Sequence, residues 1–232
     1  MITRLDQCAW TQVPDRPIVL VPTGSTEQHG PHLPFITDTL IAEAIARAVA
    51  PQLAQLTNSE VVLAPALAYG ASGEHQDFPG TISIGHQALH RMLVELIRSL
   101  STWARRIILI NGHGGNAPTI AAVVQQMCSE GHEVTWIACA TGATRDSHAG
   151  YEETSLLLHL APGLVQMERA EAGDARPLAE ILPELVRSGV REVSASGVLG
   201  DPTGANADAG KALFEAMVQV VLSQAAGEAS DP

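Results

Sequence analysis

Residues 18–38, IVLVPTGSTEQHGPHLPFITD, join a continuous apolar run to a polar segment. The run Ile18–Val21 is typical of a strand that is covered on both faces of a sheet. The segment after it carries four side chains of metal-ligand type: Glu27, His29, His32 and Asp38. This stretch therefore predicts a central strand with a functional site at its carboxyl end.

Three further apolar runs show the same pattern. They lie at Val61–Leu67, Ile107–Ile110 and Val134–Cys139. Each is followed by a glycine-containing polar segment: YGASGEHQDFPGT, NGHGGN and ATGATRDSHAGYEETS. In open α/β sheets, ligands bind beyond the carboxyl ends of the strands. We therefore expect polar residues from all four segments to converge at one edge of a sheet.

Amphipathic helical patterns separate the apolar runs and follow them. They cover Thr39–Leu53, Gln87–Trp103, Pro118–Cys128, Thr154–Leu160 and Lys211–Ser223. This alternation predicts an α/β fold with a mostly parallel central sheet flanked by helices. No internal repeat or flexible linker divides the chain, so we expect residues 1–232 to form a single domain. We interpret Ala170–Pro183 as a surface excursion and the final GEASDP as a short flexible tail.

The composition limits the classes of function. Hydrophobic residues make up 46% of the chain and charged residues 16%, which is enough to bury a sizeable core. The net charge of −12 argues against a nucleic-acid partner. No apolar run approaches the ~20 residues of a membrane span, and the first residues lack the apolar core of a secretory signal. The cysteines are scattered, which predicts a reducing, cytoplasmic location: Cys8, Cys128 and Cys139.

The strand-end segments together offer carboxylates and imidazoles. Glu27 and His29 are two residues apart, so in an extended backbone their side chains point the same way. The other members of the set are Asp38, His113, His148 and Glu153. Because nitrogen and oxygen ligands without cysteine suit a catalytic ion, the set favours Zn²⁺, Fe²⁺ or Mn²⁺. Asp38 could bridge two such ions.

Other interpretations stay open for single motifs. The EQH segment could be only a hydrogen-bonded turn, and NGHGGN could hold a phosphate, although it lacks a P-loop lysine. Four histidines are expected on the surface or in packing: His86, His90, His132 and His159. Residues that could support the ligands or touch a substrate are His32, Glu74, His75, Gly114, Gly115 and Asn116. A serine or cysteine nucleophile is disfavoured, since no GxSxG motif is present and no cysteine adjoins these histidines.

Taken together, the motifs resemble the creatininase family of metal-dependent amidohydrolases. The resemblance rests on GSTEQHGPHLP followed by TDT, on YGASGEHQDFPGTISIG, on NGHGGN and on HAGYEETS. It implies a three-layer creatininase-like fold, one or two divalent transition-metal ions, and a homo-oligomer, often a hexamer. The implied metal ligands are Glu27, His29, Asp38 and His113, with Glu153 as a further ligand or nearby acid. His148 matches the family's catalytic histidine, which moves a proton during amide cleavage.

A narrower resemblance concerns the substrate. The segments WARRIILINGHGGN, ETSLLLHL and SASGVLGDPTGANADAG look like the peptidase subfamily of mycofactocin biosynthesis. That subfamily releases a modified C-terminal Val-Tyr unit from a small precursor peptide. Creatinine-hydrolysing members carry Tyr and a metal-binding Glu where this chain has Gly114 and Gly115, which argues against creatinine and gives Glu153 more weight. The alternatives are another small-amide hydrolase, of creatinine or formamide type, and a non-catalytic metal-binding subunit.

Overall fold

A parallel sheet forms the centre of the molecule. The computed structural model describes residues 2–141 and 146–227, and within them five strands pair in the order β1-β3-β2-β4-β5. Their bounds are β1 Thr3–Arg4, β2 Ile18–Thr23, β3 Val61–Leu63, β4 Arg106–Asn111 and β5 Val134–Ala138. Every pair is parallel, which confirms the predicted sheet. β2 and β4 run side by side from Ile18 opposite Arg106 to Thr23 opposite Asn111, so both strands end at the same level.

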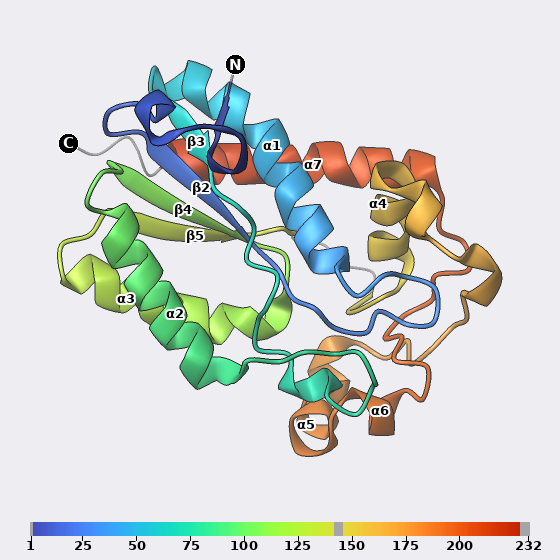
Figure 1. Ribbon diagram of the computed structural model, residues 1–232. Helices are drawn as coiled ribbons and strands as arrows, with labels where there is room; N and C mark the ends of the chain where they lie inside the picture. The colour runs from blue at the N-terminus through green and yellow to red at the C-terminus, as the bar shows by residue number, and fades with distance from the viewer. Residues whose placement is uncertain (1, 142–145, 228–232) are drawn as a thin grey trace.

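Helices occupy both faces of this sheet (Figure 1). Their bounds are α1 Thr37–Thr57, α2 Gly85–Leu100, α3 Ala117–Ser129, α4 Tyr151–Leu160, α5 Leu178–Ser188, α6 Val190–Val193 and α7 Ala207–Gly227. Short 3₁₀ turns are η1 Leu5–Gln7, η2 Trp10–Gln12, η3 Gly73–His75, η4 Gly114–Asn116, η5 Pro162–Leu164 and η6 Met167–Arg169. In the described ranges, no helix has both the length and the hydrophobicity to cross a membrane. The tail predicted for GEASDP lies, from Glu228 on, outside the described residues.

Alternate residues of the central strands pack into two separate cores. Ile18 and Leu20 of β2 face the core that α1, α4 and α7 cover. Val19 and Val21 face the core that α2 and α3 cover. This alternation follows from the two-residue period of a strand and explains why the runs read as continuously apolar. The result is the expected three-layer α/β arrangement.

Two predicted strands are shorter or less covered than expected. β3 ends at Leu63 rather than Leu67, because Pro65 has no N–H to continue the ladder. Leu67 rejoins the sheet only through an isolated bridge to Thr23. β5 lies at the edge of the sheet, and within it only Val134 and Ile137 are buried. Val134 packs in the core that α2 and α3 cover and Ile137 in the core that α1, α4 and α7 cover, so β5 is covered on both faces, as expected, but less completely than the central strands.

The interpretation of Ala170–Pro183 as a surface excursion is wrong in its last part. Helix α5 begins at Leu178 and contains Pro183, a residue that removes one backbone hydrogen bond. Tertiary packing compensates for this loss, since α5 contributes to a small core separate from the two others. The buried members of that core are Ile181, Leu185, Val190 and Leu199.

Candidate metal centre

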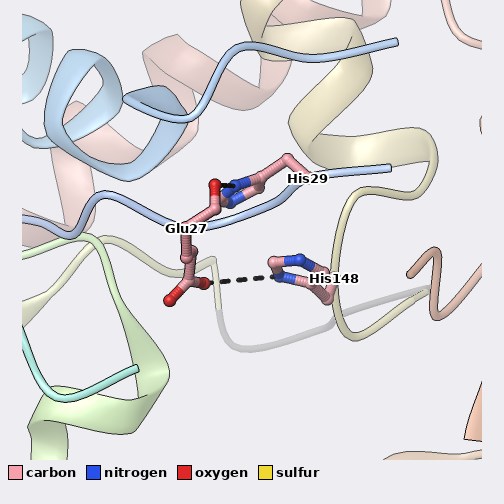
Figure 2. Close-up of side chains that lie close together, drawn as sticks. All are labelled: Glu27, His29 and His148. Carbon is pink, nitrogen blue, oxygen red and sulfur yellow. Dashed lines mark hydrogen bonds and ion pairs between the residues drawn. The ribbon is translucent and has the colours of Figure 1, made fainter. Parts of the chain in front are cut away.

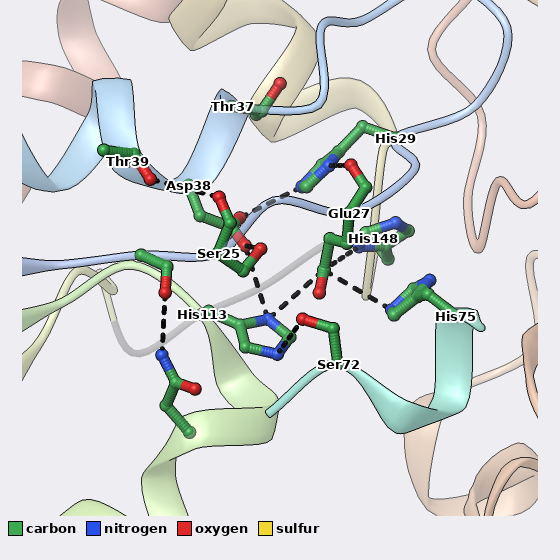
Figure 3. A network of polar contacts seen from close by, with 12 residues as sticks. Ser25, Glu27, His29, Thr37, Asp38, Thr39, Ser72, His75, His113 and His148 are labelled. Atoms are coloured by element: carbon green, nitrogen blue, oxygen red, sulfur yellow. Dashed lines mark hydrogen bonds and ion pairs between the residues drawn. The ribbon is translucent and has the colours of Figure 1, made fainter. Parts of the chain in front are cut away.

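A cluster of carboxylates and imidazoles lies beyond the carboxyl ends of β2 and β4 (Figure 3). Glu27 and His29 follow β2, and His113 follows β4. Asp38 lies in the first turn of α1, where the helix dipole favours a negative charge. All four side chains are at least 95% buried, and they point toward one another from these three segments. The convergence expected from the strand ends is thus present.

Asp38 lies between two histidines and presents a different oxygen to each. Its Oδ1 is 3.0 Å from His29 Nε2, and its Oδ2 is 3.3 Å from His113 Nδ1. Ser25 Oγ donates a 2.6 Å hydrogen bond to the same Oδ2, which fixes the carboxylate. Asp38 is therefore shared by two groups that could each hold an ion, Glu27–Asp38–His113 and His29–Asp38–Glu153. A carboxylate that faces two ligand groups is the arrangement that bridges a pair of ions.

The carboxylate of Glu27 is buried without a hydrogen-bond partner among the described residues. Its Oε1 lies 3.2 Å from His113 Nδ1 and 3.4 Å from His75 Nε2, but neither contact has hydrogen-bond geometry. A buried carboxylate of this kind is costly unless something pairs with it. The surrounding oxygen and nitrogen atoms fit a divalent cation, which would pair with Glu27.

Burial and mutual attraction compete in setting the pKa values of this cluster. Burial disfavours the charged form of Glu27, but the charge and hydrogen bonding of His113 together with the charge of His75 more than offset it and lower the pKa of Glu27 to about 2. Burial likewise opposes charge on His29, but the combined attraction of Asp38, Glu153 and Glu27 raises the pKa of His29 to about 10. In the same way, the pKa of Asp38 is well below its usual range, and that of His113 well above it. Without metal, the cluster therefore holds two carboxylates and two imidazolium ions.

His148 enters the cluster from the segment before α4 (Figure 2). Its Nε2 donates a 2.8 Å hydrogen bond to the Gln28 carbonyl, which leaves Nδ1 facing Glu27 at 3.8 Å. With Glu27 and His29, it forms a third group that could hold an ion, in addition to the catalytic role that the family resemblance implied for it. Ala149, which follows His148, has a φ of 52°, a left-handed conformation that is strained for alanine and is often found at functional sites.

Glu153 lies in the first turn of α4, at the margin of the cluster. Its Oε2 accepts a 2.6 Å hydrogen bond from the Ala149 N–H and lies 3.9 Å from His29 Nε2. The Asp146 carboxylate accepts a hydrogen bond from the Tyr151 N–H at the start of the same helix. The first turn of α4 thus brings Glu153 within reach of His29 and Asp38.

Gln28 is a residue that sequence reasoning missed. Its Nε2 lies 2.8 Å from His75 Nδ1 and donates to the Gly197 carbonyl at 3.1 Å. It therefore orients His75, whose ring stacks beside that of His148 at a centroid distance of 4.4 Å. The pKa of His75 falls to about 3, because burial and then the nearby His148 disfavour its charged form. The only sequence signal for Gln28 was its position between Glu27 and His29.

The remaining predicted residues lie around the cluster rather than in it. His32 is buried, and its Nε2 is 2.8 Å from Thr154 Oγ1, away from the three candidate groups. Asn116 is fully buried; its Oδ1 accepts from the Ala71 N–H, and its Nδ2 donates to the Gly24 carbonyl, each at 2.9 Å. These bonds tie together the loops that follow β2, β3 and β4.

A family model described as creatininase, creatinine amidohydrolase, matches residues 6–224. The chain belongs to the creatininase family. A relative named mycofactocin precursor peptide peptidase, from Mycobacterium ulcerans, is 52% identical over 213 residues, which cover 90% of this chain and 85% of the relative. The peptidase of the same name from Mycobacterium tuberculosis H37Rv is 49% identical and covers 94% of this chain and 88% of its own. The creatinine amidohydrolase of Pseudomonas putida is 28% identical over 87% of this chain and 86% of its own.

Solved creatininase structures have the same fold. A variant creatininase described as Zn-Zn type aligns with a TM-score of 0.78 at 24% identity and covers 100% of both chains. A structure described as creatininase with Mn aligns with the same TM-score, identity and coverage. At this level of identity, these two structures support the fold alone.

Gly115 has no side chain, and the side chains of His113 and Glu74 occupy the space where a Cβ would lie. A Cβ on Gly115 would lie 2.4 Å from His113 Nε2 and 2.5 Å from Glu74 Oε1. Glu74, from the loop after β3, is therefore the carboxylate at this place, with Oε1 3.7 Å from His113 Nε2. Burial raises the pKa of Glu74. A cavity of about 620 Å³ adjoins the cluster and reaches Glu27, His113, His148 and Gly114.

Proposed function

We propose that this creatininase-family chain is a metal-dependent peptidase that releases the modified C-terminal Val-Tyr unit from a small precursor peptide. The observation that carries the hydrolytic role is Asp38, which is shared by two ligand groups beside Glu27, a buried carboxylate without a hydrogen-bond partner among the described residues. The relatives named mycofactocin precursor peptide peptidase, at about half identity over most of the chain, support the peptide as substrate. We also propose that residues 1–232 act as one hydrolase domain, which the family match over residues 6–224 supports.

The proposed ligands of a first ion are Glu27, Asp38 and His113. Those of a second ion are His29, Asp38 and Glu153. The ions that we propose are Zn²⁺, Fe²⁺ or Mn²⁺, a choice supported by the mixed nitrogen and oxygen ligands and by the zinc and manganese forms of other creatininases. A bound ion would supply a water of pKa ~7 and polarise the scissile carbonyl.

The protein's own groups would position the peptide and move its protons. His148 lines the cavity with Nδ1 directed at Glu27, and we propose that Nδ1 accepts the proton of the attacking water and passes it to the leaving amine. Gly114 and Gly115 also line the cavity, and their backbone N–H groups are proposed to hold the oxygen of the scissile carbonyl. Asn116 keeps this loop beside the strand ends through its bonds to Ala71 and Gly24.

Another small-amide hydrolase is the alternative within the family. A creatinine-type enzyme is disfavoured because Gly115 cannot supply the carboxylate that those members carry there, although Glu74 reaches the same place from another loop. A non-catalytic metal-binding subunit is also disfavoured, since every expected ligand type is present in the cluster. A homo-oligomer and a cytoplasmic location stay predictions.

The direct test uses the purified protein and the modified precursor peptide. Mass spectrometry should detect release of the Val-Tyr unit, and a chelator should abolish this release until a divalent ion is added back. His113→Ala is expected to lose both bound metal and turnover. Intact peptide after incubation with the metal-loaded protein would refute the proposed substrate. Full metal content in His113→Ala would refute the ligand assignment.

A further inference from the structure

Helix α5 exposes an apolar stripe to solvent. Leu178, Leu182 and Val186 recur every four residues and therefore lie on one face of the helix. They are 47%, 49% and 80% exposed, although the opposite face of α5 already packs into the core through Ile181 and Leu185. Isolated exposed apolar side chains are common, but an aligned set beside a cavity marks a surface that binds something.

The stripe lines the same cavity as the candidate metal centre. Leu178, Leu182 and Val186 form part of the wall of the 620 Å³ space that Glu27 and His148 also line. One part of this cavity is thus polar and carries the chemistry, and another part is apolar. A space of this volume is in the range of sites that bind drug-sized ligands, so it accepts more than a single small amide.

The apolar wall is held close to His148 and His75. The backbone of Leu199, a member of the α5 core, pairs with that of His148. Arg191 of α6 donates a 2.6 Å hydrogen bond to the Asp77 carbonyl, two residues beyond His75. These contacts join the segment that contains α5 and α6 to both histidine-bearing loops, so the wall has a defined position relative to the cluster.

We infer that the α5 stripe binds the apolar side chains of the unit released from the peptide, on the leaving side of the scissile amide. This inference rests on the proposed function, in which His148 donates its proton to the leaving amine. Because Leu199 links His148 to the α5 core, the leaving unit is the part of the substrate nearest to this wall. Leu182 and Val186 are then residues that determine specificity for aliphatic and aromatic side chains.

The charges around the cavity favour an uncharged unit. The carboxylates of Glu27 and Glu74 line it, and no lysine or arginine among the described residues does so. An acidic group placed against the α5 wall would meet the apolar side chains of Leu178, Leu182 and Val186 and, within the described ranges, would find no lysine or arginine there to pair with it. The leaving unit that fits best is therefore a neutral one with large apolar side chains.

Binding of two dipeptide amides, which lack a carboxylate and carry the same α-amino group, to the metal-loaded protein tests this inference by calorimetry. The probes are Val-Tyr amide and Gly-Gly amide, and the variants are Leu182→Ser and Val186→Ser. Leu164→Ser is the matched control, since Leu164 is 45% exposed but does not line the cavity. We expect the wild type and the control to bind Val-Tyr amide about tenfold more tightly than Gly-Gly amide. Each α5 variant should lose most of this preference and leave Gly-Gly binding unchanged.

Equal binding of the two dipeptides to the wild type, or an unchanged preference in Leu182→Ser, would overturn the inference. A fall in the molar mass of Leu182→Ser, measured by light scattering, would also overturn it, because the stripe would then be a contact between copies of the chain. Turnover of the modified precursor peptide distinguishes failure of this inference from failure of the proposed function. In that assay, the α5 variants should raise KM and leave kcat nearly unchanged. If the wild type prefers Val-Tyr amide but does not cleave the peptide, the proposed function fails and the apolar site stands.

Discussion

Replacing Gly115 by alanine should weaken metal binding although no proposed ligand is substituted. The new Cβ would lie 2.4 Å from His113 Nε2, 2.5 Å from Glu74 Oε1 and 2.6 Å from the Ala71 carbonyl oxygen. The Glu74 carboxylate is at the free end of a side chain and can move aside. The Ala71 carbonyl cannot move easily, because the N–H of the same residue donates a hydrogen bond to the buried Asn116. The ring of His113 must therefore move to relieve the remaining overlap with the new Cβ.

The distance by which the His113 ring must move determines the expected loss of metal affinity. Real Cβ contacts are essentially never shorter than 3.0 Å, so the distance to His113 Nε2 must grow by at least 0.6 Å. Metal–ligand distances tolerate only about 0.2 Å, and His113 Nδ1 is held 3.2 Å from Glu27 on the opposite side of the ring. Crowding of this kind costs about 1–3 kcal/mol. If that cost appears in binding, the affinity for the ion falls roughly 5- to 150-fold.

Gly114→Ala is the matched control, because a Cβ on Gly114 meets no atom within 4 Å. Both variants, together with the wild type, would be stripped of metal and titrated with Zn²⁺ against a chromogenic chelator. Circular dichroism would establish that all three proteins are folded. We expect Gly114→Ala to bind within about twofold of the wild type, since only chain entropy changes there. Wild-type affinity in Gly115→Ala would refute the steric argument.

Three further predictions concern proton transfer, loop packing and pH. His148→Ala should keep its full metal content by elemental analysis while kcat falls about 10²- to 10⁴-fold; an unchanged kcat would exclude the proton-donor role. Asn116→Ala leaves the buried Ala71 N–H and Gly24 carbonyl unpaired, so urea titration should show the free energy of unfolding lowered by about 2–4 kcal/mol; a change below about 1 kcal/mol would contradict this. In the metal-free protein the pKa of His29 is raised to about 10 and that of His113 is also well above its usual range, so from pH 6.5 upward each holds a proton that the unfolded state has lost. Each of these two protons should lower the stability by about 1.4 kcal/mol per pH unit as the pH rises toward 10, and a flat profile in urea titrations of the metal-free protein would contradict the assignment.

The central part of the fold could be predicted because its signals are local. Each buried strand is a continuous apolar run, and parallel strands end at one edge, so the proximity of Glu27, Asp38 and His113 follows from connectivity alone. Helix α5 could not be predicted in this way. Its sequence contains Pro183, which argues against a helix, and the helix forms because Ile181 and Leu185 find partners that are distant along the chain.

The details of the site depend on loop paths that no periodicity encodes. The alternation rule correctly placed Glu27 and His29 in one cluster, but it suggested that Gln28 would point away from the site. The segment after β2 makes only isolated bridges, so Gln28 is free to turn toward His75 and the Gly197 carbonyl. The position of His75 depends in turn on the loop that Asn116 ties to the strand ends.

The choice of residue types in the cluster follows from the need to bury charge both with and without an ion. Without metal, the negative charges of Glu27 and Asp38 are balanced by protons on His29 and His113. A single divalent ion brings the same two positive charges as those two protons, so it can replace them without changing the net charge of the buried site, and Glu153 would balance part of the charge of a second ion. Lysine or arginine could also balance the carboxylates, but they would keep their charge and exclude the ion, whereas a histidine that yields its proton becomes a metal ligand. Because the imidazoles lie beside the carboxylates, the buried cluster can stay packed both when its histidines carry protons and when a metal ion replaces those protons.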